Sequence, residues 1–251
     1  MVDTHRNCEN RKDCYPVATA RGTDLIGRIV IELPKIILAS ASPRRAEIMS
    51  TVGWGFETLA VNIDESRRAG EAAADYVQRL ALDKAEAAAA IAGGNATPGS
   101  PAGQPGWRGA VSEGAASSPC ARYVIGADTT VTIDDYILEK PIDDADATRM
   151  LRILSNRWHK VMTGVAVVDR TRSFTRVAYE ETEVKFALLS DAEIQWYVAT
   201  GETMDKAGAY AIQGLGARFI ERIRGDYFNV VGLPVRLLYE LIKFAAEHID
   251  D

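Results

Sequence analysis

Two neighbouring arginines stand where the chain passes from an expected strand into an expected helix. The apolar run at residues 35–39 predicts a buried strand, and Ser42 before Pro43 predicts a helix start. Arg44 and Arg45 then fall in the first helical turn, where the helix dipole already presents positive potential. A phosphate would relieve this crowding, because helix N-termini and guanidinium groups both bind oxyanions. These residues alone support a phosphate site and a solvated arginine pair equally well.

Lys84 is a second charge in an unusual place. A helix is expected at residues 72–92, and its apolar stripe includes Leu80, Ala81 and Ala88. At 100° per residue, Lys84 falls in the middle of that stripe. A lysine there either extends its amine out to solvent or reaches an anion in a cleft.

Asp128 is a third. It lies within the β-rich, apolar run 123–133, although aspartate is disfavoured in strands. A buried Asp128 would need a cation, a metal or several hydrogen-bond donors, and the alternative is a local bond to the backbone. A hairpin turn at 134–135 and a returning strand at 136–140 would bring Lys140 close enough to be a partner.

Alternating strands and helices must position these charges. Besides the segments above, we expect strands at 56–63, 161–168, 182–188 and 219–223, and helices that begin at Asp144, Ser190 and Pro234. Ser190 and Glu193 form a capping box for a helix that should end at Gly201. The pattern predicts an α/β fold, a mixed twisted sheet flanked by helices, with sites at the strand-to-helix turns.

Composition limits the classes of protein and of partner. The 251 residues, 47% of them hydrophobic, suit one domain or two small lobes, and the net charge of -6 disfavours binding to nucleic acid or membrane. No stretch is apolar enough to span a membrane, no signal peptide is recognisable, and three cysteines (Cys8, Cys14 and Cys120) fit a reducing compartment. We therefore expect a cytoplasmic protein.

Two regions are expected to lie outside the main domain at 35–245. Residues 1–34 show no strong period and predict a poorly ordered N-terminal extension. Residues 93–121 are rich in Gly, Pro, Ser and Ala, which is typical of a flexible surface insertion. Within the domain, His159 is interpreted as structural, and the glycines of 205–216 indicate close backbone approach to something.

Several short motifs, in order, resemble those of the Maf family of septum-formation-like nucleoside triphosphate pyrophosphatases. They are Leu38-Ala39-Ser40-Ala41-Ser42-Pro43-Arg44-Arg45, Asp64-Glu65, Lys84-Ala85, Gly126-Ala127-Asp128-Thr129, Lys140-Pro141, Asp205-Lys206-Ala207-Gly208-Ala209-Tyr210, Ile212-Gln213-Gly214 and Val231-Gly232-Leu233-Pro234. The resemblance covers nearly all of residues 35–243 and departs from the family in the extension and the insertion.

The resemblance implies two lobes around a nucleotide cleft, in an inosine-triphosphatase-like fold. It also implies a divalent metal, Mg²⁺ or Mn²⁺, and hydrolysis of a nucleoside triphosphate to the monophosphate and pyrophosphate. Asp128 would accept the proton, and the phosphates and metal would be lined by Ser40, Arg44, Arg45, Glu65, Lys84 and Lys140. Whether Asp128 acts as base or as metal ligand, with Glu65 as the second candidate ligand, stays open.

Three positions that differ between subgroups of the family, Arg44, Thr129 and Gln213, resemble the dTTP/UTP pyrophosphatase subgroup. Such an enzyme would serve nucleotide-pool housecleaning. Two alternatives are a nucleotide-binding regulator of septum formation with little turnover, and a pyrophosphatase mainly for modified nucleotides. The expected partner is the nucleotide, and a homodimer is compatible with the sequence.

Overall fold

The computed structural model describes residues 34–93, 121–134, 136–172 and 174–247. The expectations for the N-terminal extension, the insertion and the three cysteines therefore lie outside the described residues. No helix among the described residues is long and apolar enough to cross a membrane.

Seven strands form one sheet in the order β2-β1-β3-β5-β6-β7, and β4 pairs with β3. The strands are β1 (Ile36–Ala39), β2 (Phe56–Thr58), β3 (Tyr123–Ile133), β4 (Tyr136–Leu138), β5 (Trp158–Asp169), β6 (Phe174–Phe186) and β7 (Ile220–Arg224). The pairs β1–β2 and β1–β3 are parallel, and all others are antiparallel. This confirms the predicted mixed sheet.

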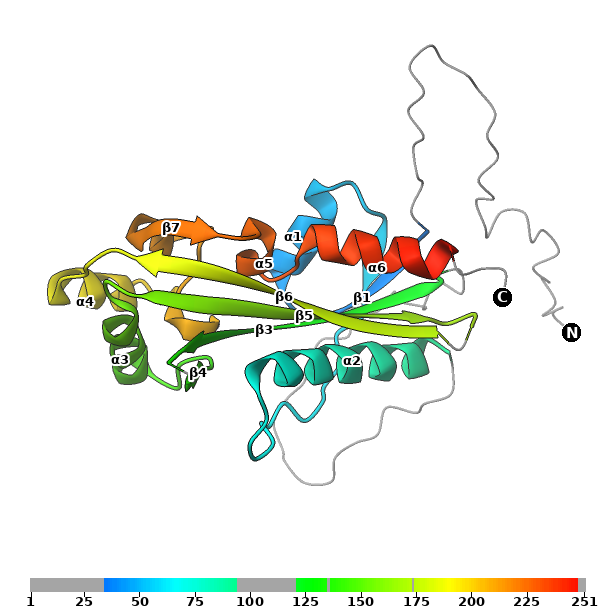
Figure 1. Ribbon diagram of the computed structural model, residues 1–251, viewed down its shortest axis with the longest axis horizontal. Helices are drawn as coiled ribbons and strands as arrows, with labels where there is room; N and C mark the ends of the chain where they lie inside the picture. Colours follow the sequence, from blue (N-terminus) through cyan, green and yellow to red (C-terminus); the bar gives the residue numbers. More distant parts are fainter. Residues whose placement is uncertain (1–33, 94–120, 135, 173, 248–251) are drawn as a thin grey trace, which may run out of the picture.

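Helices cover both faces of the sheet. They are α1 (Pro43–Thr51), α2 (Ala73–Ala92), α3 (Asp144–Leu154), α4 (Asp191–Ala199), α5 (Tyr227–Val231) and α6 (Val235–Glu247), with 3-10 turns η1 (Ala207–Ala209) and η2 (Leu215–Phe219). Figure 1 shows α2 on one face, α1 and α6 on the other, and α3 and α4 at one end. The chain therefore divides into two lobes along a shared sheet.

Helix α2 lies unusually close to the sheet. Its sheet-facing side is built from alanines, among them Ala81 and Ala85. A Cβ atom added at Gly126 of β3 would lie 1.9 Å from the carbonyl oxygen of Ala81, and one at Gly164 of β5 would lie 2.2 Å from that of Val77. Only glycine at these two strand positions allows the helix backbone to approach so closely.

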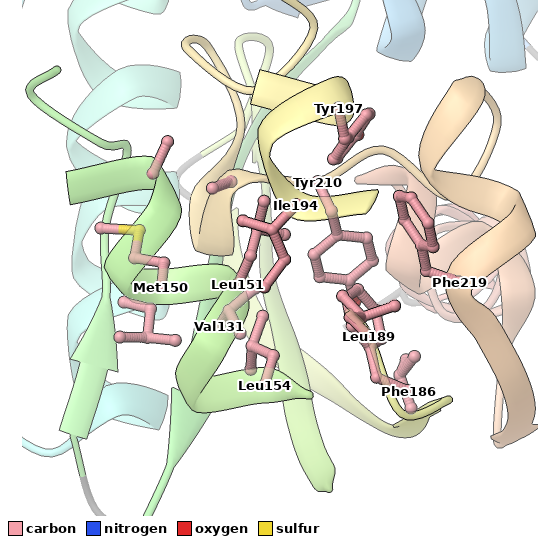
Figure 2. Close-up of a cluster of buried hydrophobic side chains, with 14 of the residues drawn as sticks. Val131, Met150, Leu151, Leu154, Phe186, Leu189, Ile194, Tyr197, Tyr210 and Phe219 are labelled. Atoms are coloured by element: carbon pink, nitrogen blue, oxygen red, sulfur yellow. The ribbon is translucent and has the colours of Figure 1, made fainter. Parts of the chain in front are cut away.

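The lobe that carries α3 and α4 has its own apolar core, in which large side chains from α3, α4, β6 and η2 meet Tyr210 (Figure 2). His159 is 2% exposed there, and its Nε2 lies 2.8 Å from the hydroxyl of Tyr210. Burial lowers the pKa of His159 to about 3. The imidazole is thus a neutral core group, as expected from the sequence.

The helices begin close to where the sequence predicts them, and the capping box of Ser190 and Glu193 is present. Ser42 differs from expectation: it precedes α1 but its side chain makes no capping hydrogen bond. Strand boundaries differ more. β2 ends at Thr58 rather than at 63, because β1 has only four residues with which to pair.

Strands β5 and β6 are longer than predicted, and β4 and β7 shift at their ends. β5 begins at Trp158 rather than at 161, and β6 begins at Phe174 rather than at 182. The first half of β6 is half-exposed and pairs along its length with β5, so its apolar alternation is weak in the sequence. β4 ends at Leu138 rather than at 140, and β7 runs one residue later than predicted.

Candidate active site

The site lies beside the middle of β3. One edge of β3 pairs with β1 over residues 123–126 and then with β4 over residues 131–133. No described strand pairs with residues 127–130 on that edge. The segment that leaves β1 at Ser40 and the segment that leaves β4 toward Lys140 therefore both reach the gap that contains Asp128.

A cavity of about 460 Å³ opens at this gap. All nine residues that the sequence singled out line it: Ser40, Arg44, Arg45, Glu65, Lys84, Asp128, Thr129, Lys140 and Gln213. They come from α1, α2, β3 and four connecting segments. The tertiary structure thus brings together positions that are up to 173 residues apart in the chain.

Lys84 links two carboxylates in the cavity wall. Its Nζ lies 2.6 Å from Oδ1 of Asp128 and 2.7 Å from Oε1 of Glu65. The side chain of Lys84 is 11% exposed and that of Asp128 14%, whereas that of Glu65 is half-exposed. Burial acts to raise the pKa of Glu65, but the hydrogen bond and charge of Lys84 outweigh it and keep that pKa below its usual range. The lysine reaches anions and does not extend to solvent.

Arg45 is fixed by three neutral partners. Its Nε donates to the carbonyl oxygen of Gly232 at 2.7 Å, Nη1 to Ser40 Oγ at 3.2 Å and Nη2 to Thr129 Oγ1 at 3.0 Å. None of these partners carries a charge that would neutralise the guanidinium. Burial lowers the pKa of Arg45, although arginine stays protonated in proteins. A buried, oriented guanidinium of this kind is suited to bind an oxyanion.

Behind Arg45 runs a chain of hydroxyl groups that the sequence did not reveal. Thr129 Oγ1 lies 3.0 Å from Thr163 Oγ1, and Thr163 Oγ1 donates to the carbonyl oxygen of Asn229 at 3.0 Å. Because the Thr163 proton goes to Asn229, Thr129 must donate to Thr163 while it accepts from Arg45. The hydroxyl of Thr129 is therefore occupied by the protein. Register pairing of Thr129 with Thr163 across β3 and β5 creates this contact, and spacing in the sequence carries no signal of it.

Arg44 and Gln213 also line the cavity. Arg44 Nη1 is 3.8 Å from Oδ2 of Asp205, across the gap between α1 and the segment before η1. Gln213 is exposed and follows η1. Another wall residue that the sequence missed is Tyr76, whose hydroxyl donates to the carbonyl oxygen of Glu65 at 3.0 Å and so holds the Glu65 segment against α2.

The donor set suits a hard divalent cation only if a ligand completes it. Among the described residues, no group of three His, Cys, Asp or Glu side chains is placed to hold a metal ion. Glu65 and Asp128 are two carboxylates on one cavity, however, and Mg²⁺ is commonly held by one or two carboxylates together with phosphate oxygens. The residues present therefore fit a cation that arrives with a phosphorylated ligand.

The cavity contains two kinds of group that a hydrolytic reaction on a polyphosphate needs. Basic side chains can bind the phosphates, and a carboxylate can accept a proton. Five of its lining residues are basic: Arg44, Arg45, Lys84, Lys140 and Lys206. Asp128 stands among them on a rigid strand, which is where a general base for a hydrolytic reaction must be held.

Comparison with known proteins gives consistent matches over most of the chain. The family model described as Maf-like protein matches residues 35–245. A dTTP/UTP pyrophosphatase of Shewanella oneidensis is 45% identical over 215 residues, which are 84% of this chain and 97% of that relative. Similar matches are found with the dTTP/UTP pyrophosphatases of Vibrio cholerae (45% over 83% of this chain and 95% of the relative) and Geobacter sulfurreducens (46% over 82% and 93%).

Among solved structures, the chain is similar to the Ham1 protein of Staphylococcus aureus, with a TM-score of 0.44 and 13% identity. The match covers 85% of this chain and 98% of that chain.

Proposed function

The chain belongs to the family of Maf-like proteins, and from that membership and the cavity we propose that it is a nucleoside triphosphate pyrophosphatase. In this proposal it hydrolyses its substrate to the nucleoside monophosphate and pyrophosphate. The observation that carries this proposal is the joining of Arg45, Lys84 and Asp128 in one cavity. Relatives that are 45% identical over most of the chain are named dTTP/UTP pyrophosphatases, which supports dTTP and UTP as substrates.

In the reaction, water attacks the α-phosphorus, and the bond from that phosphorus to the bridging oxygen breaks as pyrophosphate leaves. Arg44, Arg45 and Lys140 bind phosphate oxygens, and this positioning and charge neutralisation supply most of the catalysis. Asp128 accepts the proton of the water, and Lys84 orients its carboxylate through the 2.6 Å contact. Glu65 would hold the divalent cation with the phosphates, where the cation offsets their negative charge.

Choice of base is assigned to the wall that carries Gln213. An exposed amide can pair with the carbonyl and imide edge of a pyrimidine, and a base that leaves such a group unpaired is rejected. Arg44 would repel the positive charge of a methylated purine such as 7-methyl-GTP. Thr129 affects base choice only indirectly, because its hydroxyl is already hydrogen-bonded to Arg45 and Thr163. Since the proposed substrates belong to the nucleotide pool, we place the enzyme in the cytoplasm.

Product analysis with competing substrates tests the proposal. The purified protein, with Mg²⁺ or Mn²⁺, is given dTTP, UTP, CTP, GTP, 7-methyl-GTP and modified triphosphates, and monophosphate is resolved from diphosphate. We expect monophosphate and pyrophosphate in equal amounts and the highest kcat/KM for dTTP and UTP. Diphosphate as product, or binding without turnover, would contradict the proposed reaction. A higher kcat/KM for a purine than for dTTP and UTP would contradict only the proposed choice of base. If dTTP and UTP are preferred, Gln213→Glu is expected to reduce that preference.

A further inference from the structure

The segment 211–216, which carries Gln213, is held at both ends by two side chains that do not line the cavity. The hydroxyl of Tyr197, in α4, accepts from the backbone N–H of Ala211 at 3.1 Å. Glu202, just beyond α4, accepts from the N–H of Leu215 at 2.9 Å and from that of Gly216 at 3.1 Å.

These two side chains are also bound to each other. The Tyr197 hydroxyl donates to Oε1 of Glu202 at 2.7 Å, the same oxygen that accepts from Gly216, while Oε2 accepts from Leu215. Tyr197 is fully buried in the core of the α3 and α4 lobe, where Figure 2 shows it beside that core's other large side chains. The pair therefore anchors both ends of the segment to a rigid part of the molecule.

The glycines of the segment are fitted to these two side chains. A Cβ atom at Gly214 would lie 2.2 Å from Oε2 of Glu202, and one at Gly216 would lie 2.6 Å from the Tyr197 hydroxyl. Close backbone approach was expected here from the sequence. For these two glycines, the groups approached are protein side chains.

The carboxylate of Glu202 is suited to this task because it is charged. Burial acts to raise its pKa, but the hydrogen bonds from Leu215, Tyr197 and Gly216 outweigh it, so that the pKa of Glu202 lies below its usual range. Hydrogen bonds from N–H groups to an ionised acceptor are about twice as strong as those between neutral groups. Both oxygens are used, so no neutral isostere can replace them without placing a donor against a donor.

We propose that Glu202 and Tyr197 are positioning residues for base selection, because they fix the segment from which Gln213 meets the base. The inference rests on the proposed function insofar as Gln213 reads the base. Gln213 is exposed on the cavity wall, so its backbone decides where its amide stands. If the two anchors were lost, the amide of Gln213 could adapt to several different bases. Selectivity among bases would fall, whereas phosphate binding would be unaffected.

A double-mutant cycle on selectivity tests this inference. The variants are Glu202→Gln, Gln213→Ala and the combination of both. In the wild-type background, Glu202→Gln should lower the ratio of kcat/KM for dTTP over GTP about tenfold, mostly through KM for dTTP. In the Gln213→Ala background it should change that ratio by less than about twofold, because a residue that acts through Gln213 has nothing left to position.

The matched control is Glu193→Gln, which alters an exposed glutamate in α4 whose side chain, among the described residues, is hydrogen-bonded only to Ser190. It should lower the melting temperature slightly and leave the ratio unchanged. An unchanged ratio in Glu202→Gln would overturn the inference, and so would an equal fall of the ratio in both backgrounds.

Amide hydrogen exchange separates this inference from the proposed function. Without any nucleotide, Glu202→Gln should speed exchange at the N–H groups of Leu215 and Gly216 about tenfold or more, and Glu193→Gln should not. A wild-type protein without turnover would remove the proposed function, while exchange would still report on the anchors. Unchanged exchange rates in Glu202→Gln would contradict the anchoring role of Glu202, whether or not the wild-type protein turns over nucleotide.

Discussion

At the residue scale, the position of the Lys84 side chain is set by the ion pairs of its amine and not by the packing of its aliphatic part. From the sequence, methionine at this position would pack well if the amine had no structural partner. The structure supplies two partners, Asp128 and Glu65. Removal of the amine would leave two neighbouring carboxylates without their shared cation, and an unpaired buried charge is costly.

We therefore expect Lys84→Met to lower both kcat/KM and the melting temperature. Restoring charge balance should recover stability but not activity, so the double variant Lys84→Met/Asp128→Asn should melt closer to the wild type than Lys84→Met does. Thermal melting of the three proteins at one pH measures this. A melting temperature of Lys84→Met at or above that of the wild type would mean that the ion pairs contribute nothing to stability.

Asp128→Asn is expected to remove catalysis and leave the fold intact. Asparagine has nearly the same size and keeps a hydrogen-bond acceptor for Lys84, but it cannot take a proton from water. A general base typically contributes ~10²–10⁴-fold to the rate, so kcat should fall by about that factor. Steady-state kinetics with dTTP measures the loss, and thermal melting is the control. Turnover near that of the wild type would exclude Asp128 as the base.

His159 should make stability depend on pH. The folded protein keeps this histidine neutral down to about pH 3, whereas the same group titrates near 6.5 when unperturbed. Between these values the unfolded chain binds a proton that the folded protein does not. The free energy of unfolding therefore falls as the pH falls through this window, by up to about 1.4 kcal/mol per pH unit, and the full contribution is present above it.

The variant His159→Gln lacks this titration. Its free energy of unfolding should decline less steeply than that of the wild type on acidification from about pH 6.5 to about pH 4. Denaturant unfolding at several pH values measures both slopes, and acidic groups common to the two proteins cancel in the comparison. Parallel slopes would show that His159 binds its proton equally in the folded and the unfolded state.

At the element scale, the distance between α2 and the sheet decides whether Lys84 reaches Asp128. Gly126 and Gly164 lie on the face of the sheet that α2 covers, and register places Gly164 opposite Asp128. Because the helix contributes small alanines and the strands contribute glycines, the backbone of α2 can approach the backbones of β3 and β5 closely. Lys84 then needs only its own length to bridge α2 and β3.

Gly164→Ala should separate these elements. The new Cβ would meet the Val77 carbonyl oxygen at 2.2 Å, so α2 must shift. We expect a loss of about 1–3 kcal/mol in the free energy of unfolding, as for other overpacked cores, together with a lower kcat/KM. Gly55→Ala is the control, because a Cβ there has no heavy atom within 4 Å among the described residues beyond its own chain neighbours. Equal stability of the two variants, measured by denaturant unfolding, would argue against close packing as the cause.

At the scale of the whole molecule, the strand order creates the site. β1 and β4 share one edge of β3 and leave a gap between them, into which the segments after β1 and β4 both lead. Helices α1 and α2, from opposite faces of the sheet, add Arg45 and Lys84. One strand thus receives basic side chains from both faces of the sheet.

Residues 94–120 are expected to be dispensable. Arg170 donates to the carbonyl oxygen of Ala92 at 2.5 Å and to that of Ala121 at 3.0 Å, so the two ends of the segment lie close together. Replacing residues 94–120 by a short Gly/Ser linker should preserve folding, since shortening a long loop changes its closure entropy by only about 0.6 kcal/mol per halving. Thermal melting and kcat/KM should stay near wild-type values, and loss of activity in soluble protein would assign the segment a role at the cavity.

The sequence by itself determined the order of the main elements and singled out nine residues that line the candidate site. Arg45, Lys84 and Asp128 are recognisable because each is a charge in a local setting that disfavours it, and local settings are read from neighbours in the chain. Motif order then indicated the family.

Only the tertiary structure decided which groups these charges meet. The chain of hydroxyl groups behind Arg45 depends on strand register, and the anchoring of residues 211–216 depends on the packing of α4. The limits of β2 and β6 likewise follow from the length of the strand beside each. Contacts of this kind join residues far apart in the chain, so no pattern of spacing or composition encodes them locally.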